Sequence, residues 1–280
     1  MIASEQYSYK EQTANGWGDA IKSYTLFAQN FTSFYSTDAI DLTLGKDSRS
    51  SNIKVLDVAC GTGQLTFKAY NKLAKGQNNY VLGTDFSNVM IDFMNHAIQE
   101  NQLKNIDAKV MDGQNLKELV DNTFDYAYSI FGLTFFIDRS KGFKEMHRVL
   151  NTGGKICIGT WCHDAAYFKI LKEVSAQFLA EPLPFEGSAF SLSDKDQLQS
   201  ELEAAGFKDI EIHTTVHNLS LNNYEEVFDY FENNPIYLRV KESINEAQRT
   251  DFDNRIIQYI KTTYNSLHLP AGAFIAIGTK

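Results

Sequence analysis

The residues best suited to chemistry lie in one short segment, Asp57 to Gly63, which reads Asp-Val-Ala-Cys-Gly-Thr-Gly. An apolar run ends at the acid, and two glycines then lead into a stretch with helical periodicity. Glycines at such a turn let a ligand approach the backbone at the carboxyl edge of a parallel sheet. A second acid, Asp85, stands 22 residues after Gly63, where a carboxylate can accept two hydrogen bonds from a ribose. The spacing therefore predicts a nucleotide-type ligand.

Two kinds of ligand share this layout, and the charge of the turn distinguishes them. The pyrophosphate of a nicotinamide or flavin dinucleotide favours a helix N-terminus free of carboxylates, so Asp57 is unfavourable for it. Thr66 also stands where the third glycine of the dinucleotide fingerprint is expected. S-adenosylmethionine instead presents an ammonium and a sulfonium group, which an acid attracts. The pattern favours the cationic ligand, and an NAD- or flavin-dependent oxidoreductase is the alternative.

The elements that must position these residues alternate between strand and helix. Five strand patterns, separated by helical stretches, occur at 53–58, 80–84, about 106–111, 124–130 and 155–161. Two further strand patterns follow at 208–216 and 271–279. This order predicts an α/β fold with a doubly wound, mainly parallel seven-stranded sheet, helices on both faces and a helical lid.

Four regions are expected along the chain. Residues 1–52 predict a helical segment over the ligand site, and 53–161 predict the ligand-binding core. Residues 162–205 are helical with proline and glycine interruptions, and they predict a helical lid inserted above the sheet. Residues 206–280 are expected to complete the sheet, with a helical excursion at about 223–266.

Composition excludes several classes of protein. The formal charge is -9, with 35 acidic and 26 basic residues and no Lys/Arg cluster, so the electrostatic footprint of a nucleic-acid binder is missing. No apolar run reaches the roughly 18 residues of a membrane span. The three cysteines, Cys60, Cys157 and Cys162, have no C-x-x-C spacing and indicate neither a disulfide framework nor a zinc site. We expect a cytoplasmic protein without a metal; the sequence leaves its oligomeric state open.

The ordered set of motifs resembles the class I, Rossmann-like S-adenosylmethionine-dependent methyltransferases. It is most similar to their small-molecule branch, which includes the ubiquinone/menaquinone-biosynthesis methyltransferases. Asp57 to Gly63 resembles the family's first motif, residues 83–90 its second, and 111–113 the acid after its third strand, while 124–127 and 145–154 resemble later motifs. The resemblance implies S-adenosylmethionine as methyl donor, S-adenosylhomocysteine as product and a small-molecule acceptor whose O, N or C atom is undetermined.

Residue roles follow from the same resemblance. Asp57 would orient the ammonium, Asp85 would hold the ribose, Phe86 and Met90 would pack on adenine, and Asp112 would accept from its exocyclic amine. The residues that the resemblance places around the cofactor are Asp57, Ala59, Gly61, Gly63, Asp85, Phe86, Met90, Asp112, Gly113, Gln114, Ile130 and Phe131, with Trp17 and Tyr24 from the N-terminal segment.

Each role has a plainer alternative. Asp85 could be a turn acid, Met90 part of a helix core, Asp112 the cap of the following turn, and Trp17 and Tyr24 buried anchors. The whole chain could also be a non-catalytic S-adenosylmethionine-binding module, because a fold does not determine a function.

The acceptor side is less clearly marked. The exit of the fourth strand, 129–136, lacks the Asn/Asp-Pro-Pro-aromatic motif that the family uses to methylate amide or base nitrogens. His163, just beyond the fifth strand, is the candidate general base, with a surface histidine as the alternative. Aromatic residues between 162 and about 270 could line an apolar acceptor cavity with Phe131 and Phe135.

Overall fold

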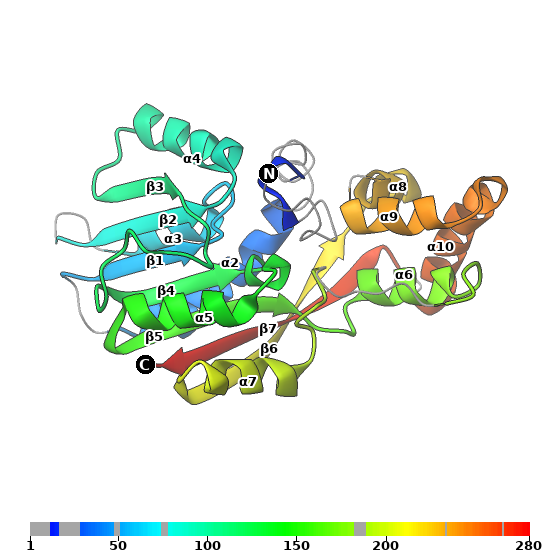
Figure 1. Ribbon diagram of the computed structural model, residues 1–280. Coiled ribbons are helices and arrows are strands. Elements are labelled where there is room, and N and C mark those ends of the chain that lie inside the picture. The colour runs from blue at the N-terminus through cyan, green and yellow to red at the C-terminus, as the bar shows by residue number, and fades with distance from the viewer. Residues whose placement is uncertain are drawn as a thin grey trace, which may run out of the picture.

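The computed structural model describes residues 12–16, 29–47, 51–73, 78–181, 189–232, 234–264 and 266–280. Its centre is a seven-stranded sheet in the order β3-β2-β1-β4-β5-β7-β6. The strands are β1 (Lys54–Val58), β2 (Tyr80–Asp85), β3 (Ile106–Val110), β4 (Phe124–Ile130), β5 (Leu150–Trp161), β6 (Lys208–Ser220) and β7 (His268–Thr279). The first five pair in parallel, and β7 runs antiparallel to both β5 and β6. The expected mainly parallel seven-stranded sheet is confirmed (Figure 1).

Helices cover both faces of this sheet, because alternate strand residues point to opposite sides. One face packs against α2 (Gln29–Leu42), α3 (Gln64–Lys72) and α4 (Asn88–Glu100). The other face packs against α5 (Arg139–Val149) and α7 (Lys195–Ala204). The central strands are apolar on both sides, as a parallel strand between two helical layers should be.

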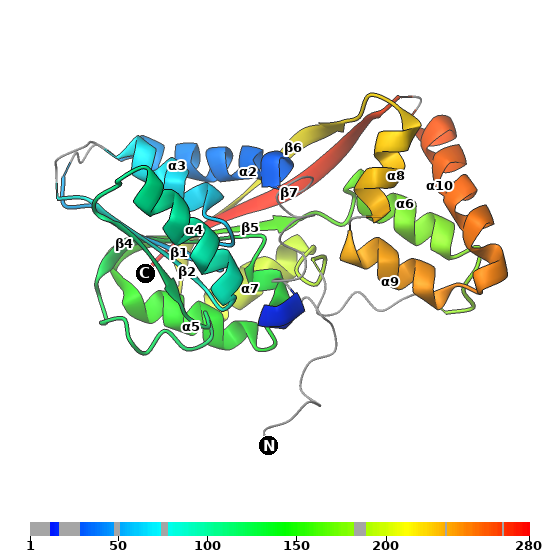
Figure 2. The same ribbon diagram turned by 90° about the horizontal axis from the view of Figure 1, so that it is seen from above.

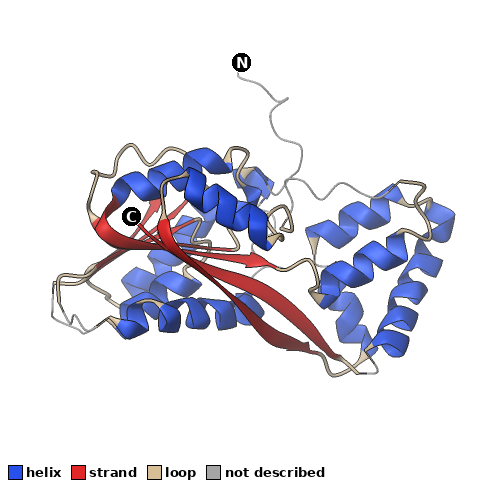
Figure 3. Cartoon of the chain, turned by 90° about the horizontal axis from the view of Figure 1, so that it is seen from below, coloured by secondary structure: helices blue, strands red, loops and turns tan. Residues whose placement is uncertain are grey.

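A separate group of helices stands at the far end of a long two-stranded ribbon formed by β6 and β7. It consists of α6 (Ala166–Ser175), α8 (Tyr224–Glu232), α9 (Pro235–Ser243) and α10 (Arg249–Thr263), which share one apolar core. We call this group the helical body. Figure 2 shows it on the side of the sheet toward which the β5 arrow points, and Figure 3 shows the ribbon reaching it. The helical body therefore faces the carboxyl edge of the sheet, where ligands bind in this class of fold.

The segment expected to form one lid, 162–205, divides between two places. Its first half supplies α6 to the helical body, whereas α7 lies on the sheet next to α5. Leu198 and Leu202 explain the difference, since their i,i+4 spacing forms an apolar stripe that is buried against β7 and the strand β6 that follows. The expectation of a lid over all of 162–205 was therefore wrong for α7.

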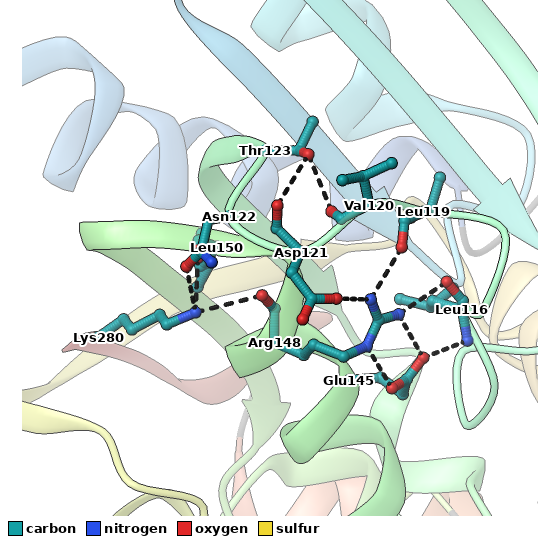
Figure 4. Close-up of polar contacts among 10 residues, drawn as sticks. All are labelled: Leu116, Leu119, Val120, Asp121, Asn122, Thr123, Glu145, Arg148, Leu150 and Lys280. Atoms are coloured by element: carbon teal, nitrogen blue, oxygen red, sulfur yellow. Dashed lines mark hydrogen bonds and ion pairs between the residues drawn. The ribbon is translucent and has the colours of Figure 1, made fainter.

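A charged clamp at the opposite edge of the sheet fixes the chain between β3 and β4 (Figure 4). The Arg148 guanidinium donates to the Glu145 carboxylate, to the carbonyls of Leu116 and Leu119, and to Asp121. The Arg148 bonds lower the pKa of Glu145 and outweigh its partial burial. Because these bonds are charge-assisted and several share one planar fork, they restrain the loop that connects the two strands.

Candidate active site

The turn after β1 is built from unusual backbone conformations. Ala59, Gly61 and Gly63 have φ angles of 56°, 54° and 88°. A Cβ added to Gly63 would lie 2.8 Å from the Met94 Sδ, so the turn is packed tightly against α4. The left-handed conformation is costly for Ala59, the one alanine of the three. The structure brings Asp57, Ala59, Gly61 and Gly63 together at the carboxyl edge of the sheet.

Asp57 is almost completely buried at the end of β1, with an exposed fraction of 2%. The Thr66 hydroxyl donates to its Oδ2 at 2.6 Å. Burial raises the pKa of Asp57 to about 7, against the effect of the Thr66 bonds, and the nearby charge of Asp85 adds to the rise. The carboxyl group is thus poised between its neutral and charged forms, and a cation beside it would favour the charged form. In the sequence, Thr66 stood out only as a missing glycine, although its place one turn into the helix was a signal for this contact.

Asp85 ends β2 and is held by main-chain groups. Its Oδ2 accepts from the Gly61 N–H at 2.9 Å, and its Oδ1 accepts from the Ser87 N–H at 2.9 Å. Burial raises the pKa of this carboxyl group, and the backbone bonds oppose that effect. Each carboxylate oxygen has a second lone pair, so both can still accept from a ribose hydroxyl. Asp85 thus makes the main-chain contacts expected of a turn acid, and its carboxylate oxygens can still accept hydrogen bonds from a ribose.

Three buried hydroxyls near this edge have no hydrogen-bond partner among the described residues. They belong to Thr62, Ser87 and Ser129. Ser87 stands at the N-cap of α4, but its side chain makes no cap bond. These residues follow β1 and β2 or lie near the end of β4, and the three strands are neighbours in the sheet. Because a buried polar group without a partner is costly, these hydroxyls are candidates for contact with a polar ligand.

The segment after β3 brings the next predicted residues to the same edge. Asp112 is exposed, and its Oδ1 accepts from the Gln114 N–H at 2.9 Å. The turn-capping alternative for Asp112 is therefore present in the structure. Gln114 also accepts, through its side-chain oxygen, from the Asp138 N–H at 2.8 Å. A Cβ on Gly113 would lie 2.4 Å from the Phe136 ring, so only glycine fits there.

The predicted adenine contacts lie on either side of the start of α4. Phe86 is partly exposed, whereas Met90 is 2% exposed. Met90 therefore belongs to the buried side of α4, which agrees with the alternative that it is a helix-core residue. Trp17 and Tyr24 lie outside the described residues.

A stack of three aromatic rings begins where β4 ends. Phe131 lies on Trp161 with ring centroids 4.1 Å apart, and Trp161 lies parallel to Phe31 at 6.2 Å. We call these three residues the aromatic stack. Tyr35 meets Phe131 and Trp161 edge-on, both at 5.3 Å, and its hydroxyl donates to the Ala271 carbonyl. Sequence reasoning identified Phe131 and its neighbour Ile130, but it missed Phe31 and Tyr35, whose i,i+4 spacing on a helix was the available signal.

The aromatic stack adjoins the glycine-rich turn. A Cβ added to Gly132, the residue after Phe131, would lie only 2.4 Å from the Ala59 Cβ. Phe131 itself has a φ of 61°, and its N–H donates to the Gly159 carbonyl at 2.8 Å. Phe131, whose backbone is strained, thus lies at the end of the aromatic stack that is next to the glycine-rich turn after β1.

The histidines lie in three different surroundings. His163 is exposed in the loop after β5. His217 instead lies 2.7 Å from the Asp38 Oδ2, with its ring stacked on Phe34 at 5.2 Å. His147 packs edge-on against the Phe207 ring at 5.0 Å, on the outer side of the sheet.

The described ranges hold no group of three or more His, Cys, Asp or Glu side chains that could bind a metal ion. They also hold no helix whose length and apolar character would let it cross a membrane.

A family model described as a methyltransferase domain matches residues 49–206. The chain belongs to this methyltransferase family. The methyltransferase is 32% identical to the demethylmenaquinone methyltransferase of Geobacillus sp. over 57% of this chain and 72% of that protein. It is 34% identical to the enzyme of the same name from Staphylococcus haemolyticus, over 58% and 71%.

A solved structure shows the same fold. The YcgJ protein of Bacillus subtilis superposes with a TM-score of 0.56 at 14% identity, covering 87% of this methyltransferase and 98% of that chain. The prediction of a class I methyltransferase with S-adenosylmethionine as methyl donor and a small-molecule acceptor is confirmed. The oxidoreductase alternative is set aside.

Proposed function

We propose that this methyltransferase transfers the methyl group to an aromatic small molecule whose ring binds beside Phe131 and Trp161. The observation that carries the proposal is the contact of the β4 exit with the turn after β1, where Gly132 leaves just enough room for Ala59. One end of the aromatic stack is thereby next to the turn that the cofactor's methionine part is expected to occupy. Aromatic rings favour stacked or edge-to-face partners, which this surface offers.

The buried acids and the unpartnered hydroxyls support the proposed cofactor contacts. In this proposal Asp57 faces the ammonium, Asp85 accepts from the ribose hydroxyls, and Gly61 and Gly63 allow the close approach. Phe86 and Asp112 contact the adenine ring and its amine. Met90, Gly113 and Gln114 complete that side; Ala59, Ile130 and Phe131 border the reactive end.

The protein's part in the reaction is mainly positional. The cofactor supplies a methyl group that is already activated by its sulfonium. The aromatic stack orients the acceptor in line with that group, and the buried surroundings of Asp57 and Asp85 exclude water. For a hydroxyl acceptor a general base is needed, and His163 stays the proposed candidate because it is exposed just beyond β5.

The names of the relatives suggest the first acceptor class to test. Two of them are demethylmenaquinone methyltransferases, so we propose a quinol ring as the acceptor. The helical body, α6 with α8 to α10, is proposed to select the acceptor. The three cysteines are free and buried, which supports the proposed reducing, cytoplasmic setting.

The test is a methylation assay with labelled S-adenosylmethionine and reduced short-chain demethylmenaquinone or simpler quinols, run beside calorimetry with S-adenosylhomocysteine. We expect saturable binding of S-adenosylhomocysteine and label transfer to at least one aromatic acceptor. Binding of S-adenosylhomocysteine without label transfer to any aromatic acceptor would overturn the proposal of an aromatic acceptor. Trp161→Ala should raise the acceptor KM and leave S-adenosylhomocysteine binding unchanged.

A further inference from the structure

The side chain of Gln114 joins the segment after β3 to the beginning of α5. Its oxygen, Oε1, accepts from the Asp138 N–H at 2.8 Å. Its nitrogen, Nε2, lies 3.1 Å from Oδ1 and 3.4 Å from Oδ2 of Asp112. Because a main-chain N–H can only donate and a carboxylate accepts, the amide oxygen of Gln114 must face Asp138 and its NH2 group must face Asp112. The two contacts together therefore fix the orientation of the amide.

The Asp138 end of this bridge belongs to a well-anchored helix. Asp138 is the N-cap of α5, and its side chain accepts from the Ser140 hydroxyl at 2.7 Å and from the Lys141 N–H at 3.2 Å. The Ser140 bond is the main cause of the lowered pKa of Asp138, and the bonds from Lys141 add to it. The apolar side of α5 is buried in the core on its face of the sheet. The Gln114 amide is thus attached to a fixed point of the fold.

The Asp112 end of the bridge is an exposed carboxylate. Its Oδ1 accepts from the Gln114 main-chain N–H at 2.9 Å as well as from Nε2 at 3.1 Å. Its Oδ2 has only the longer contact with Nε2, at 3.4 Å, among the described residues. An exposed aspartate without such donors would exchange between rotamers. The contacts therefore restrain the carboxylate and leave Oδ2 with capacity for a further donor.

Asp112 lies next to the place proposed for adenine. The Met111 N–H donates to the Asp85 carbonyl at 2.9 Å, so the residues that follow, Asp112 and Phe86, leave the ends of β3 and β2 side by side. The exocyclic amine of adenine is a hydrogen-bond donor, whereas hypoxanthine has a carbonyl oxygen at the same position. A carboxylate only accepts, so it favours adenine and is unfavourable beside hypoxanthine.

We propose that Gln114 is a positioning residue that determines the selectivity of the cofactor site for adenine. Its amide holds the Asp112 carboxylate so that Oδ2 accepts from the exocyclic amine. The inference rests on the proposed function, which assigns that amine to Asp112, and it gives the Gln114 side chain a role of its own. Because Asp112 is ordered before the cofactor arrives, less side-chain freedom is lost on binding adenine.

The test compares two ligands that differ at the amine edge of the base. S-adenosylhomocysteine carries adenine and S-inosylhomocysteine carries hypoxanthine, and both are titrated by calorimetry into the full chain. The measured quantity is the selectivity ratio, the Kd of S-inosylhomocysteine divided by that of S-adenosylhomocysteine. We expect a ratio of about ten or more for the wild type. Gln114→Met keeps the length of the side chain without its polar groups and should lower the ratio about threefold or more.

A double-mutant cycle separates positioning from a purely structural effect. Asp112→Asn removes the group through which Gln114 acts, so adding Gln114→Met to it should lower the selectivity ratio no further. Gln197→Met is the matched control, because Gln197 also donates through Nε2 to a carboxylate, that of Glu201 at 2.9 Å, but it lies on α7. The control should keep the wild-type ratio.

Three results would overturn the inference. Gln114→Met could keep the wild-type selectivity ratio, even while weakening both ligands equally, or it could lower the ratio as much with Asn at position 112 as with Asp. A wild-type ratio near one would also remove the adenine contact of Asp112 from the proposed function. If Gln114→Met does not fold, Gln114→Ala takes its place and must lower the ratio in the same way. Failure of S-adenosylhomocysteine itself to bind would overturn the proposed function and the inference with it.

Discussion

Cofactor binding should depend on pH through Asp57. Burial raises the pKa of this carboxyl group to about 7 in the free protein. A bound ammonium group requires the ionised carboxylate, so the affinity for S-adenosylhomocysteine should follow the ionised fraction of Asp57. With this pKa the ionised fraction is about nine tenths at pH 8 and about one tenth at pH 6. The Kd for S-adenosylhomocysteine should therefore be about tenfold higher at pH 6 than at pH 8.

The same titration affects the stability of the free protein, with the opposite sign. The pKa of Asp57 in the folded protein, about 7, lies above the ordinary value of 3.8 for an exposed carboxyl group, so the folded state binds this proton more tightly. The stabilisation is complete below about pH 4 and is lost as the pH rises through 7. The difference of about three between the pKa values of Asp57 in the folded and unfolded protein corresponds to about 4 kcal/mol of free energy of unfolding for this fully buried group.

Calorimetry in two buffers of different ionisation enthalpy measures both the Kd and the protons exchanged. At pH 7 about half a proton should be released for each S-adenosylhomocysteine bound. Asp57→Asn keeps an oxygen for Thr66 and removes the charge; it should bind the ligand weakly at every pH. Asp57→Asn should also gain thermal stability relative to the wild type as the pH rises from 5 to 8. Thr66→Val removes a bond that lowers the pKa, so its binding midpoint should move to higher pH.

The reasoning would be refuted by a Kd that is the same at pH 6 and pH 8, with no proton exchanged on binding. Such a result would mean that Asp57 is either ionised throughout or neutral in the complex, and the ammonium contact would have to be assigned to other groups.

Further expectations concern four other positions. Asp85→Ala should weaken S-adenosylhomocysteine binding by about 1.5–3 kcal/mol for each ribose hydrogen bond lost, and an unchanged affinity in the folded variant would leave only the turn role. Ala59→Gly should raise the free energy of unfolding by about 1 kcal/mol, measured by urea denaturation, because glycine has no penalty at a φ of 56°. Trp161→Leu should raise the acceptor KM more than it lowers kcat, and a change confined to kcat would argue against a stacking role. Arg148→Met should destabilise the fold by about 1.5–3 kcal/mol with S-adenosylhomocysteine affinity retained, so a selective loss of binding would contradict its structural role.

The sequence was most informative where local signals and function coincide. The apolar run into Asp57, the two glycines and the acid at the end of the next strand are each encoded within a few residues. The strand and helix alternation from 53 to 161 therefore predicted the sheet and brought Asp57, Asp85 and Asp112 to one edge.

Long-range packing could not be predicted in the same way. Helical periodicity shows that α6 and α7 each have an apolar side, but it does not tell which surface covers that side. The stacking of Phe31 on Trp161 joins residues far apart in the chain, and the burial that raises the pKa of Asp57 depends on the completed core. These features follow from the tertiary fold, which short-range patterns describe only in part.

The position of β7 has a consequence for the order of folding. β7 lies between β5 and β6, although it is the last of the seven strands along the chain. During synthesis β6 therefore finds no partner in the growing sheet until the residues of β7 have emerged, and β5 keeps an open edge for the same period. Contacts that join such distant parts of a chain form slowly, and open edges are sites of wrong pairing. A chain halted after α10 should thus bind chaperones or aggregate, even though the motif that holds the cofactor was made long before.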